Sequence, residues 1–356
     1  MSVDLLVAGG GPAGLATALH AVRAGLSVRV WEPRSDPVDK ACGEGLMPGA
    51  LALLAELDVD PPGHALRGIR YVGGGRAATA DFGAGPGRGV RRTALHDALA
   101  HAVREAGVTV EHRTAREVRQ DDAGVTVDGE RAGHLVAADG LHSPLRRALG
   151  LERAPRARRR HGLRRHYRLA PWTSYVEVHW GAAAEAYVTP VADDLVGVAV
   201  LTSQRAGYDE HLAAFPALRE RLAGAEPDGD VRGAGPLRQR TRARTAGRVL
   251  LVGDAAGYVD ALTGEGVALG LAQARAAVDA VAAGDVARYE REWPRLTRRY
   301  RWLTAGLVAA TRPAPARRAI VPVARAARPV FGLVVDQLAS GHGRDVTRPD
   351  AAPARA

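Results

Sequence analysis

A glycine-rich turn near the start of the chain constrains the fold more than any other feature of the sequence. The segment Gly9-Gly10-Gly11-Pro12-Ala13-Gly14 has the pattern G-x-G-x-x-G and lies between an apolar run at residues 3–8 and a helical pattern from Leu15 to Ala24. A second apolar run at 26–31 ends at Glu32-Pro33. Strand, glycine turn, helix and strand in this order predict a βαβ unit with a phosphate-binding turn.

The spacing of the glycines indicates what each one does in such a turn. Gly9 permits the tight turn, Gly11 lets the backbone approach a pyrophosphate, and Gly14 lets the helix pack closely on the strand. The N–H groups and the positive dipole end of the helix then face the phosphates. Glu32 follows Gly14 by 18 positions, where a carboxylate that binds ribose hydroxyls is expected.

A second glycine-bearing helix start lies far along the chain. The apolar run Val249–Val252 leads into Gly253-Asp254, and Thr263-Gly264-Glu265-Gly266 opens a helical pattern that continues to about residue 283. These features exceed what a nicotinamide dinucleotide needs, and they suit FAD. Asp254 is expected on a ribityl hydroxyl, and the later helix start would stabilise negative charge on the reduced flavin.

Three separate segments together resemble the FAD fingerprints of the para-hydroxybenzoate-hydroxylase-like flavoproteins, the group A flavoprotein monooxygenases. They are Gly9–Gly14 with Glu32, the segment Ala138-Asp139-Gly140-Leu141-His142-Ser143-Pro144-Leu145-Arg146, and Gly253-Asp254 with Thr263–Gly266. The resemblance runs from residue 3 to about 285. It implies that Arg92 contacts the cofactor and that Asp139 lies close to FAD and to transiently docked NAD(P)H. Asp139-Gly140 also fits a simple turn, with Ser143 as the N-cap of a helix, and both interpretations can hold together.

The sequence and the resemblance together give a set of expected cofactor positions. They are Gly9, Gly11, Pro12, Ala13, Gly14, Glu32, Pro33, Cys42, Gly43, Arg92, Ala115, Asp139, Asp254, Gly264, Glu265 and Gly266.

The only lysine and the only cysteine lie two residues apart, in Lys40-Ala41-Cys42-Gly43-Glu44. This stretch resembles the Lys-x-Cys-Gly segment of the geranylgeranyl-reductase branch of the superfamily, where it lies near the isoalloxazine. Glu44 departs from the glycine usual in that branch. The branch's Tyr-x-Trp-x-Phe-Pro motif is also missing, and Tyr187-Val188-Thr189-Pro190 is its nearest counterpart. Cys42 is interpreted either as a small half-buried hydrophobic residue or as a flavin contact.

Alternating runs at 175–180, 185–191 and 195–201 predict an antiparallel substrate sheet. In the first run Tyr175, Glu177 and His179 share one face, whereas Val176, Val178 and Trp180 share the other. If the polar face lines the pocket, His179, Tyr175 or Tyr187 could hydrogen-bond a substrate hydroxyl or act as a general acid or base. If the Val/Trp face lines it, the pocket is apolar. The sequence leaves both open. The candidate catalytic residues are Cys42, His179 and Tyr187.

The basic charge of the chain raises the question of an anionic partner. The formal net charge is +10, and eight arginines lie within Arg153–Arg168. Arginines in that number could neutralise phosphates, but Tyr167 is the only aromatic residue among them, so no nucleic acid is expected. We expect either a solvated connector or a rim that attracts NAD(P)H or an anionic substrate. One cysteine excludes an intramolecular disulfide, and no metal-ligand motif or Gly-x-Ser-x-Gly elbow is present.

Residues 302–338 mix apolar runs with arginines and could cap the active site, dimerise or touch a membrane.

These patterns predict an α/β fold in which a discontinuous Rossmann-like FAD-binding domain carries an inserted antiparallel β-sheet substrate domain and a helical C-terminal part. The expected boundaries are 1–70, 90–150 and 240–290 for the FAD-binding domain, 71–89 and 151–239 for the substrate domain, 291–343 for the helices and 344–356 for a flexible tail.

The first functional hypothesis is an NAD(P)H- and O2-dependent monooxygenase that hydroxylates or epoxidises a small hydrophobic metabolite through a flavin C4a-hydroperoxide. The alternative is a flavin-dependent reductase or dehydrogenase acting on an isoprenoid or other activated double bond, and a nucleic-acid-binding flavoprotein is a remote third. Neither a signal peptide nor a stretch of roughly 18 apolar residues is evident, so a cytoplasmic monomer or homodimer without an integral membrane segment is expected.

Overall fold

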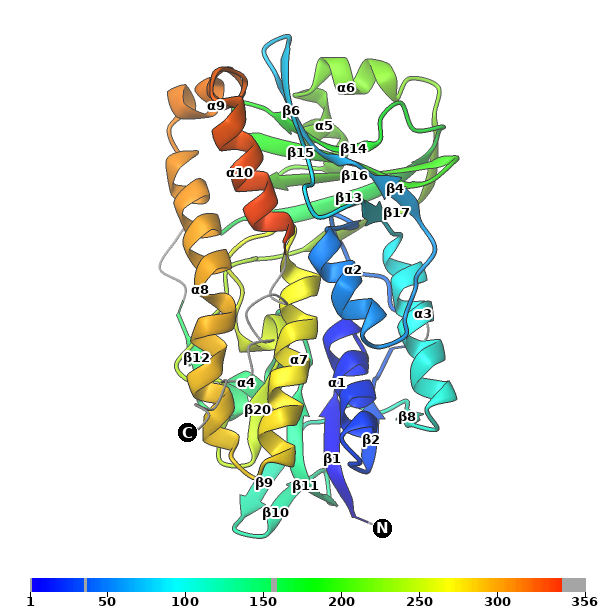
Figure 1. The fold of residues 1–356 in the computed structure, drawn as a ribbon, viewed down its shortest axis with the longest axis vertical. Helices are drawn as coiled ribbons and strands as arrows, with labels where there is room; N and C mark the ends of the chain where they lie inside the picture. The colour runs from blue at the N-terminus through cyan, green and yellow to red at the C-terminus, as the bar shows by residue number, and fades with distance from the viewer. Residues whose placement is uncertain (1, 35–36, 155–158, 341–356) are drawn as a thin grey trace, which may run out of the picture.

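Two large β-sheets and a layer of helices make up the structure (Figure 1). The computed structural model describes residues 2–34, 37–154 and 159–340. An eight-stranded sheet has the order β19-β20-β11-β1-β2-β8, with β10 and β9 attached to β11, and a seven-stranded sheet has the order β17-β13-β16-β15-β14-β5-β6. The α/β architecture with an inserted sheet and C-terminal helices confirms the predicted fold class.

The strands divide between these two sheets and two small ones. The eight-stranded sheet contains β1 (Val3–Ala8), β2 (Val28–Trp31), β8 (Thr109–Glu111), β9 (Val118–Asp121), β10 (Gly124–Val127), β11 (Glu130–Ala137), β19 (Thr245–Ala246) and β20 (Val249–Leu251). The seven-stranded sheet contains β5 (Gly68–Gly73), β6 (Arg76–Asp81), β13 (His161–Arg168), β14 (Tyr175–Trp180), β15 (Ala184–Ala192), β16 (Leu195–Thr202) and β17 (Glu226–Ala234). The small sheets contain β3 (Gly45–Leu46), β4 (His64–Leu66) and β7 (Gly87–Gly89), and β12 (Glu152–Arg153) with β18 (Arg240–Thr241).

The helices, in chain order, are α1 (Pro12–Arg23), α2 (Pro48–Ala55), α3 (Arg92–Glu105), α4 (Pro144–Ala148), α5 (Tyr208–Ala213), α6 (Pro216–Arg221), α7 (Gly266–Ala282), α8 (Val286–Ala310), α9 (Ala314–Ala326) and α10 (Arg328–Ala339). A 3-10 turn spans Gly253–Ala256.

The centre of the eight-stranded sheet is parallel, because β1 pairs in parallel with β2 and β11, and β11 pairs in parallel with β20. Strand β20 is apolar throughout and β1 is apolar and buried from Leu5 to Ala8, as expected where a strand is covered on both faces. Helices α1 and α7 lie side by side against them (Figure 1). The carboxyl ends of the parallel strands therefore point toward one edge of the sheet, which is where open α/β folds bind their ligands.

The seven-stranded sheet is antiparallel at β14, β15 and β16, as the alternating pattern predicts. It also contains one parallel pair, β14 with β5, which the sequence analysis did not anticipate. The chain leaves β5 and β6 and passes through part of the FAD-binding domain before it returns as β14, so no tight hairpin forces the two strands to be antiparallel. Strand β5 (Gly68–Gly73) crosses the boundary that was expected at residues 70 and 71 between the FAD-binding domain and the substrate domain.

The C-terminal helices cover one end of the seven-stranded sheet. Helix α9 contacts β5, β6 and β14, and α10 contacts β6. The tail expected at 344–356 lies outside the described residues. Within residues 2–34, 37–154 and 159–340, no helix combines the length and the hydropathy that a membrane crossing requires.

Candidate functional site

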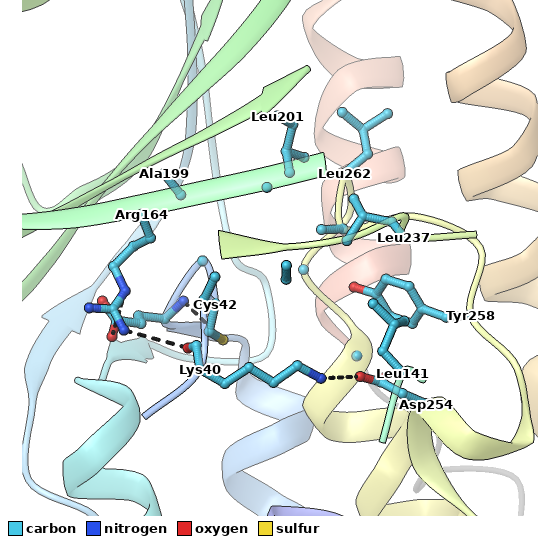
Figure 2. A pocket seen from close by; sticks show the side chains of 18 of the residues that line it. Lys40, Cys42, Leu141, Arg164, Ala199, Leu201, Leu237, Asp254, Tyr258 and Leu262 are labelled. Carbon is cyan, nitrogen blue, oxygen red and sulfur yellow. Dashed lines mark hydrogen bonds and ion pairs between the residues drawn. The ribbon is translucent and has the colours of Figure 1, made fainter. Parts of the chain in front are cut away.

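A cavity of about 830 Å³ lies between the carboxyl ends of the parallel strands and the seven-stranded sheet (Figure 2). This volume is in the range of cofactor and substrate cavities. Five segments distant in the sequence meet there: the start of α1, the stretch from Lys40 to Met47, residues 138–142, Gly253-Asp254 and residues 261–267.

The first glycine turn has the close packing that its motif predicts. A Cβ atom on Gly14 would lie 1.8 Å from the carbonyl oxygen of Gly9, so α1 approaches the turn more closely than any side chain permits. Gly9 has φ +113°, and a Cβ there would lie 2.4 Å from the Ala138 carbonyl oxygen. A Cβ on Gly11, in contrast, would have its nearest neighbour at 3.9 Å, the Arg92 guanidinium. The turn is therefore closed on the strand side and open toward the cavity.

The carboxylate of Glu32 lies directly behind this turn. The Gly10 N–H donates to Glu32 Oε2 at 2.7 Å, and the Arg34 guanidinium binds both carboxylate oxygens. Burial raises the pKa of Glu32, but the hydrogen bonds from Arg34 outweigh burial and hold the pKa below its usual range. Glu32 is therefore held as a carboxylate, and Arg34 lies between it and the cavity.

Several expected cofactor positions form part of the cavity wall and others lie outside it. Gly11, Pro12, Ala13, Cys42, Gly43, Arg92, Asp139, Asp254, Gly264 and Gly266 line it. Gly9 and Gly14 shape the turn from behind, and Glu32 and Glu265 are buried beside the wall. Pro33 is exposed, and Ala115 packs into the core of the eight-stranded sheet, so neither is brought to the cavity.

The second glycine-bearing helix start lines the same cavity as the first. Gly264 has φ +71°, and α7 begins at Gly266 with Glu265 as its N-cap residue. Glu265 is 5% exposed, and burial raises its pKa to about 7. A carboxyl group that is easily neutralised thus lies beside the positive end of α7.

This raised pKa makes a stability prediction. The folded protein binds the Glu265 proton more tightly than the unfolded chain does, because the pKa is about 7 in the folded state and 4.5 in the unfolded state. This tighter binding stabilises the fold in full below pH 4.5, and the stabilisation is lost as the pH rises through about 7. We expect Glu265→Gln to match the wild type below pH 4.5 and to be more stable above pH 7, by on the order of 3 kcal/mol. Urea unfolding at both pH values measures the difference. The exposed Glu220→Gln should show no such pH-dependent gain; an equal gain there would contradict the assignment.

The segment from Lys40 to Gly45 contributes more polar contacts to the cavity than the sequence analysis anticipated. Lys40 Nζ lies 2.9 Å from Asp254 Oδ2, so an ion pair joins two sides of the cavity (Figure 2). Lys40 was not among the expected site positions, although its being the only lysine in the chain was a signal. Cys42 lines the cavity, and its Sγ accepts a hydrogen bond from the Glu44 N–H at 3.4 Å.

Glu44 joins the start of α3 to the seven-stranded sheet. Its Oε1 accepts a hydrogen bond from the Arg92 N–H at 2.9 Å, and its Oε2 lies 2.7 Å from His166 Nε2 on β13. Glu44 has φ +60°, which glycine adopts freely, so the glycine usual at this place in the reductase branch has a backbone reason. In this chain the buried hydrogen bonds of the carboxylate stabilise the glutamate there.

Hydrogen bonds from the Arg146 guanidinium fix the segment 138–146. Arg146 was not among the expected cofactor positions. Arg146 is fully buried and donates to the carbonyl oxygens of Leu141 and Ala255 at 3.0 and 3.2 Å, so it ties this segment to the 3-10 turn that carries Asp254. Ser143 Oγ accepts from the Arg146 N–H at 2.9 Å, which confirms Ser143 as an N-cap. Burial raises the pKa of Asp139, which lies at the cavity wall.

The valine face of β14 lines the cavity, which settles the alternative left open by the sequence. Val176 and Val178 form the wall together with Ala199 and Leu201 of β16. His179 points away and lies 3.1 Å from Glu177 Oε2, outside the cavity. Tyr187 lines the cavity, but its hydroxyl donates to the Leu262 carbonyl oxygen at 3.1 Å, and burial raises its pKa well above the usual value.

The arginines of the stretch 153–168 are largely paired with carboxylates of the protein itself. Arg160 contacts Glu185 at 2.6 Å, Arg165 contacts Asp209 at 3.3 Å, and Arg168 contacts Asp228 at 2.9 Å. Residues 155–158 lie outside the described chain. In the part that is described, no group of His, Cys, Asp and Glu side chains is arranged to hold a metal ion.

The residues at the cavity fit FAD. The turn at Gly9–Gly14 is open toward the cavity at Gly11, where a pyrophosphate would lie at the start of α1, and Gly264 and Gly266 at the start of α7 line the same cavity. The Arg92 side chain lines the cavity, and its buried Nε has no hydrogen-bond partner among the described residues. An unsatisfied buried donor at a phosphate-sized opening is the kind of group that a bound anion satisfies.

Comparison with known sequences identifies the family. The family model described as a FAD binding domain matches residues 2–284. A menaquinone reductase of Mycobacterium tuberculosis is 32% identical over 334 residues, with 83% of this chain and 79% of that protein covered. Digeranylgeranylglycerophospholipid reductase 1 of Methanothermobacter thermautotrophicus is 30% identical over 330 residues, covering 83% and 82%. The 3-amino-4-hydroxybenzoate 2-monooxygenase PtnB3 of Streptomyces platensis is 34% identical over 167 residues, 41% of each chain.

Comparison with solved structures shows the same fold. The flavin-dependent brominase Bmp2 superimposes with a TM-score of 0.80 at 18% identity, covering 96% of this chain and 94% of that one. A geranylgeranyl bacteriochlorophyll reductase-like protein from Thermoplasma acidophilum superimposes with a TM-score of 0.74 at 22% identity, covering 90% and 91%. The chain therefore belongs to the FAD-binding-domain family and is a FAD-dependent oxidoreductase similar to the geranylgeranyl reductases.

Proposed function

We propose that this protein is a FAD-dependent reductase that saturates a carbon–carbon double bond in an isoprenoid substrate. The observation that carries the proposal is the apolar wall that Val176, Val178 and Leu201 of the seven-stranded sheet present to the cavity, which suits a hydrocarbon chain. The relatives that match over 83% of this chain are named as reductases, whereas the monooxygenase PtnB3 matches over 41%.

FAD, when bound, supplies the two electrons as a hydride, and NAD(P)H is the proposed transient reductant. The turn at Gly9–Gly14 and Arg92 would hold the pyrophosphate, and Asp254 would hold the ribityl chain. The start of α7 stabilises negative charge on the reduced cofactor. The apolar sheet face binds the isoprenoid chain and excludes water, so that hydride and proton reach the double bond and not solvent.

Saturation of a double bond also requires a proton, and Cys42 is the proposed donor. Its thiol lines the cavity in the segment that faces the second helix start, whereas His179 lies outside the cavity and the Tyr187 hydroxyl is bound to a carbonyl oxygen. With the hydride that bound FAD would supply on one carbon, Cys42 would give its thiol proton to the other, and the thiolate would regain a proton from solvent once the product has left.

This role predicts the behaviour of Cys42→Ser. The hydroxyl gives up a proton much less readily than the thiol, so we expect kcat to fall by about a hundredfold. Reduction of the bound FAD by NAD(P)H should keep its rate, and FAD content should not change. Stopped-flow absorbance measures both half-reactions. If the variant reoxidises with substrate as fast as the wild type, Cys42 is not the donor.

One experiment separates the reductase from the monooxygenase, the first hypothesis from the sequence. The protein is reduced without oxygen and mixed with menaquinone or with digeranylgeranylglycerophospholipid, the substrates in the relatives' names. We expect anaerobic reoxidation of the flavin and a product heavier by two hydrogens for each bond reduced. A flavin that stays reduced with both probes until oxygen is added, followed by a product that gains an oxygen atom, would contradict the reductase.

A further inference from the structure

Helix α10 carries apolar side chains on two neighbouring faces. Phe331, Val335 and Leu338 are buried, and the first two pack into the cluster beneath β6. On the other face Val330 and Leu333 are 60% and 61% exposed, and Val334 is 38% exposed. A helix that is apolar on two faces normally has a partner on each, so the outer face of α10 lacks one among the described residues.

The exposed hydrophobic side chains of the described chain gather on the C-terminal helices. Six large hydrophobic residues are exposed, and five of them lie on α8, α9 or α10: Trp302, Val323, Val330, Leu333 and Val334. Trp302 is 80% exposed. It lies with Leu303, Leu333 and Val334 in a groove between α8 and α10, which we call the α8–α10 groove and which Arg298, Arg299 and Gln337 complete. In Figure 1 these helices form one flank of the molecule.

The chain segment that carries the groove is strongly basic, and Arg298 and Arg299 line the groove itself. Between Arg295 and Ser340 the sequence has nine arginines and a single carboxylate, Asp336. Six of these arginines are exposed without a carboxylate partner among the described residues: Arg295, Arg298, Arg312, Arg318, Arg325 and Arg328. In the stretch 153–168, by contrast, the described arginines mostly pair with acids. The occupant of the groove must therefore be apolar at its centre and anionic around it.

We infer that the α8–α10 groove docks the protein on an anionic lipid bilayer. Trp302, Leu333 and Val330 would enter the boundary between headgroups and acyl chains, and the surrounding arginines would contact lipid phosphates. This inference does not depend on the proposed reaction.

Two other occupants fit the groove less well. A second copy of the chain would place one arginine-rich rim against another across a twofold axis, with Asp336 as the only acid in the stretch. The sixteen residues after Ser340 contain one large apolar residue, Val346, and more arginines than acids, so their composition matches neither the apolar centre nor the charged rim. Lipid phosphates satisfy both requirements.

The groove and the cavity are lined in part by the same two helices, α8 and α10. Leu303 and Val334 line the groove, and the residues one turn further along the same helices, Leu307 and Leu338, line the cavity. The i to i+4 spacing places each pair on one side of its helix. The same two helices thus present apolar side chains to the groove and to the substrate cavity.

Vesicle binding by the full-length holoprotein tests the inference. The probes are phosphatidylcholine vesicles with and without phosphatidylglycerol, and the readouts are co-sedimentation and tryptophan fluorescence. We expect binding only with phosphatidylglycerol, weakening as salt rises, with a blue shift of the exposed Trp302. Trp302→Phe should still bind but lose the shift.

Matched variants distinguish docking through the α8–α10 groove from non-specific adsorption to vesicles. Leu333→Ser should weaken binding about tenfold through lost apolar burial, and Arg298→Gln about fivefold through a lost phosphate contact. Val110→Ser replaces an exposed valine on β8, and Arg119→Gln replaces an exposed arginine on β9. Neither of these control variants should change vesicle binding.

Three outcomes would overturn the inference. They are no vesicle binding, equal loss in the β8 and β9 controls, or a dimer in analytical ultracentrifugation that Leu333→Ser dissociates. The last would assign the groove to a second copy. FAD content and anaerobic turnover of a dispersed substrate should be unchanged in Leu333→Ser, so a failure of docking is distinguishable from a failure of the proposed reaction.

Discussion

Alanine at position 14 is expected to leave the purified protein without bound FAD. The added Cβ would lie 1.8 Å from the Gly9 carbonyl oxygen and 3.2 Å from the Ala138 Cβ. Because the closest clash is with backbone, no side chain can rotate away, and the cost should exceed the ~1–3 kcal/mol usual for overpacking. The start of α1 must then move from β1, and the phosphate turn is lost. The absorbance spectrum after gel filtration with excess FAD measures the result.

Two other glycines serve as controls for Gly14→Ala. Gly306→Ala, within α8 and with no atom near the added Cβ, should retain FAD and be stabilised by about 0.5–1 kcal/mol. Gly11→Ala should fold normally, since its Cβ would have no neighbour within 3.9 Å, but should bind FAD weakly because that Cβ enters the cavity. A yellow Gly14→Ala protein with wild-type stability would contradict the close packing of α1 on the turn.

Replacement of Arg146 by methionine is expected to cost about 3–5 kcal/mol of folding free energy, as does the loss of one partner from other buried charged networks. The guanidinium is fully buried and holds the carbonyl oxygens of Leu141 and Ala255 as well as the Gln239 side chain. Without it, residues 138–146 and the turn that carries Asp254 lose their connection. We therefore expect FAD affinity to fall together with stability, measured by urea unfolding and by fluorescence titration with FAD.

Arg147→Met provides the matched control for Arg146→Met, because Arg147 is the next residue and is exposed. It should change the free energy of unfolding by less than about 0.5 kcal/mol and leave FAD affinity unchanged. If the two variants behave alike, the contacts of Arg146 do not hold the cofactor segments together.

The local parts of the site could be predicted from the sequence because their signals are local. The turn at Gly9–Gly14 follows a strand and opens a helix, and it has that structure here. Ser143 caps its helix by accepting a hydrogen bond from the N–H of Arg146, three residues further along the chain, as N-cap residues do. Alternation within 175–201 also predicted three neighbouring antiparallel strands.

Contacts across the cavity could not be predicted, because they join residues far apart in the chain. Glu44 and His166 are 122 positions apart, and Lys40 and Asp254 are 214 apart. No periodicity relates such pairs. The face of β14 that lines the cavity was equally undetermined, since both faces are buried: Glu177 and His179 pair with each other on one side, and Val178 lies on the other. Only the packing of the neighbouring elements distinguishes them.

The central claim is that two glycine-bearing helix starts, far apart in the chain, hold one flavin between them. The amount of FAD released by denaturing the purified protein tests it most directly. We predict one FAD per chain in the wild type after equilibration and gel filtration, and a clearly lower ratio in Gly11→Ala at unchanged folding. A well-folded wild-type protein that carries no FAD after the same treatment would contradict the claim.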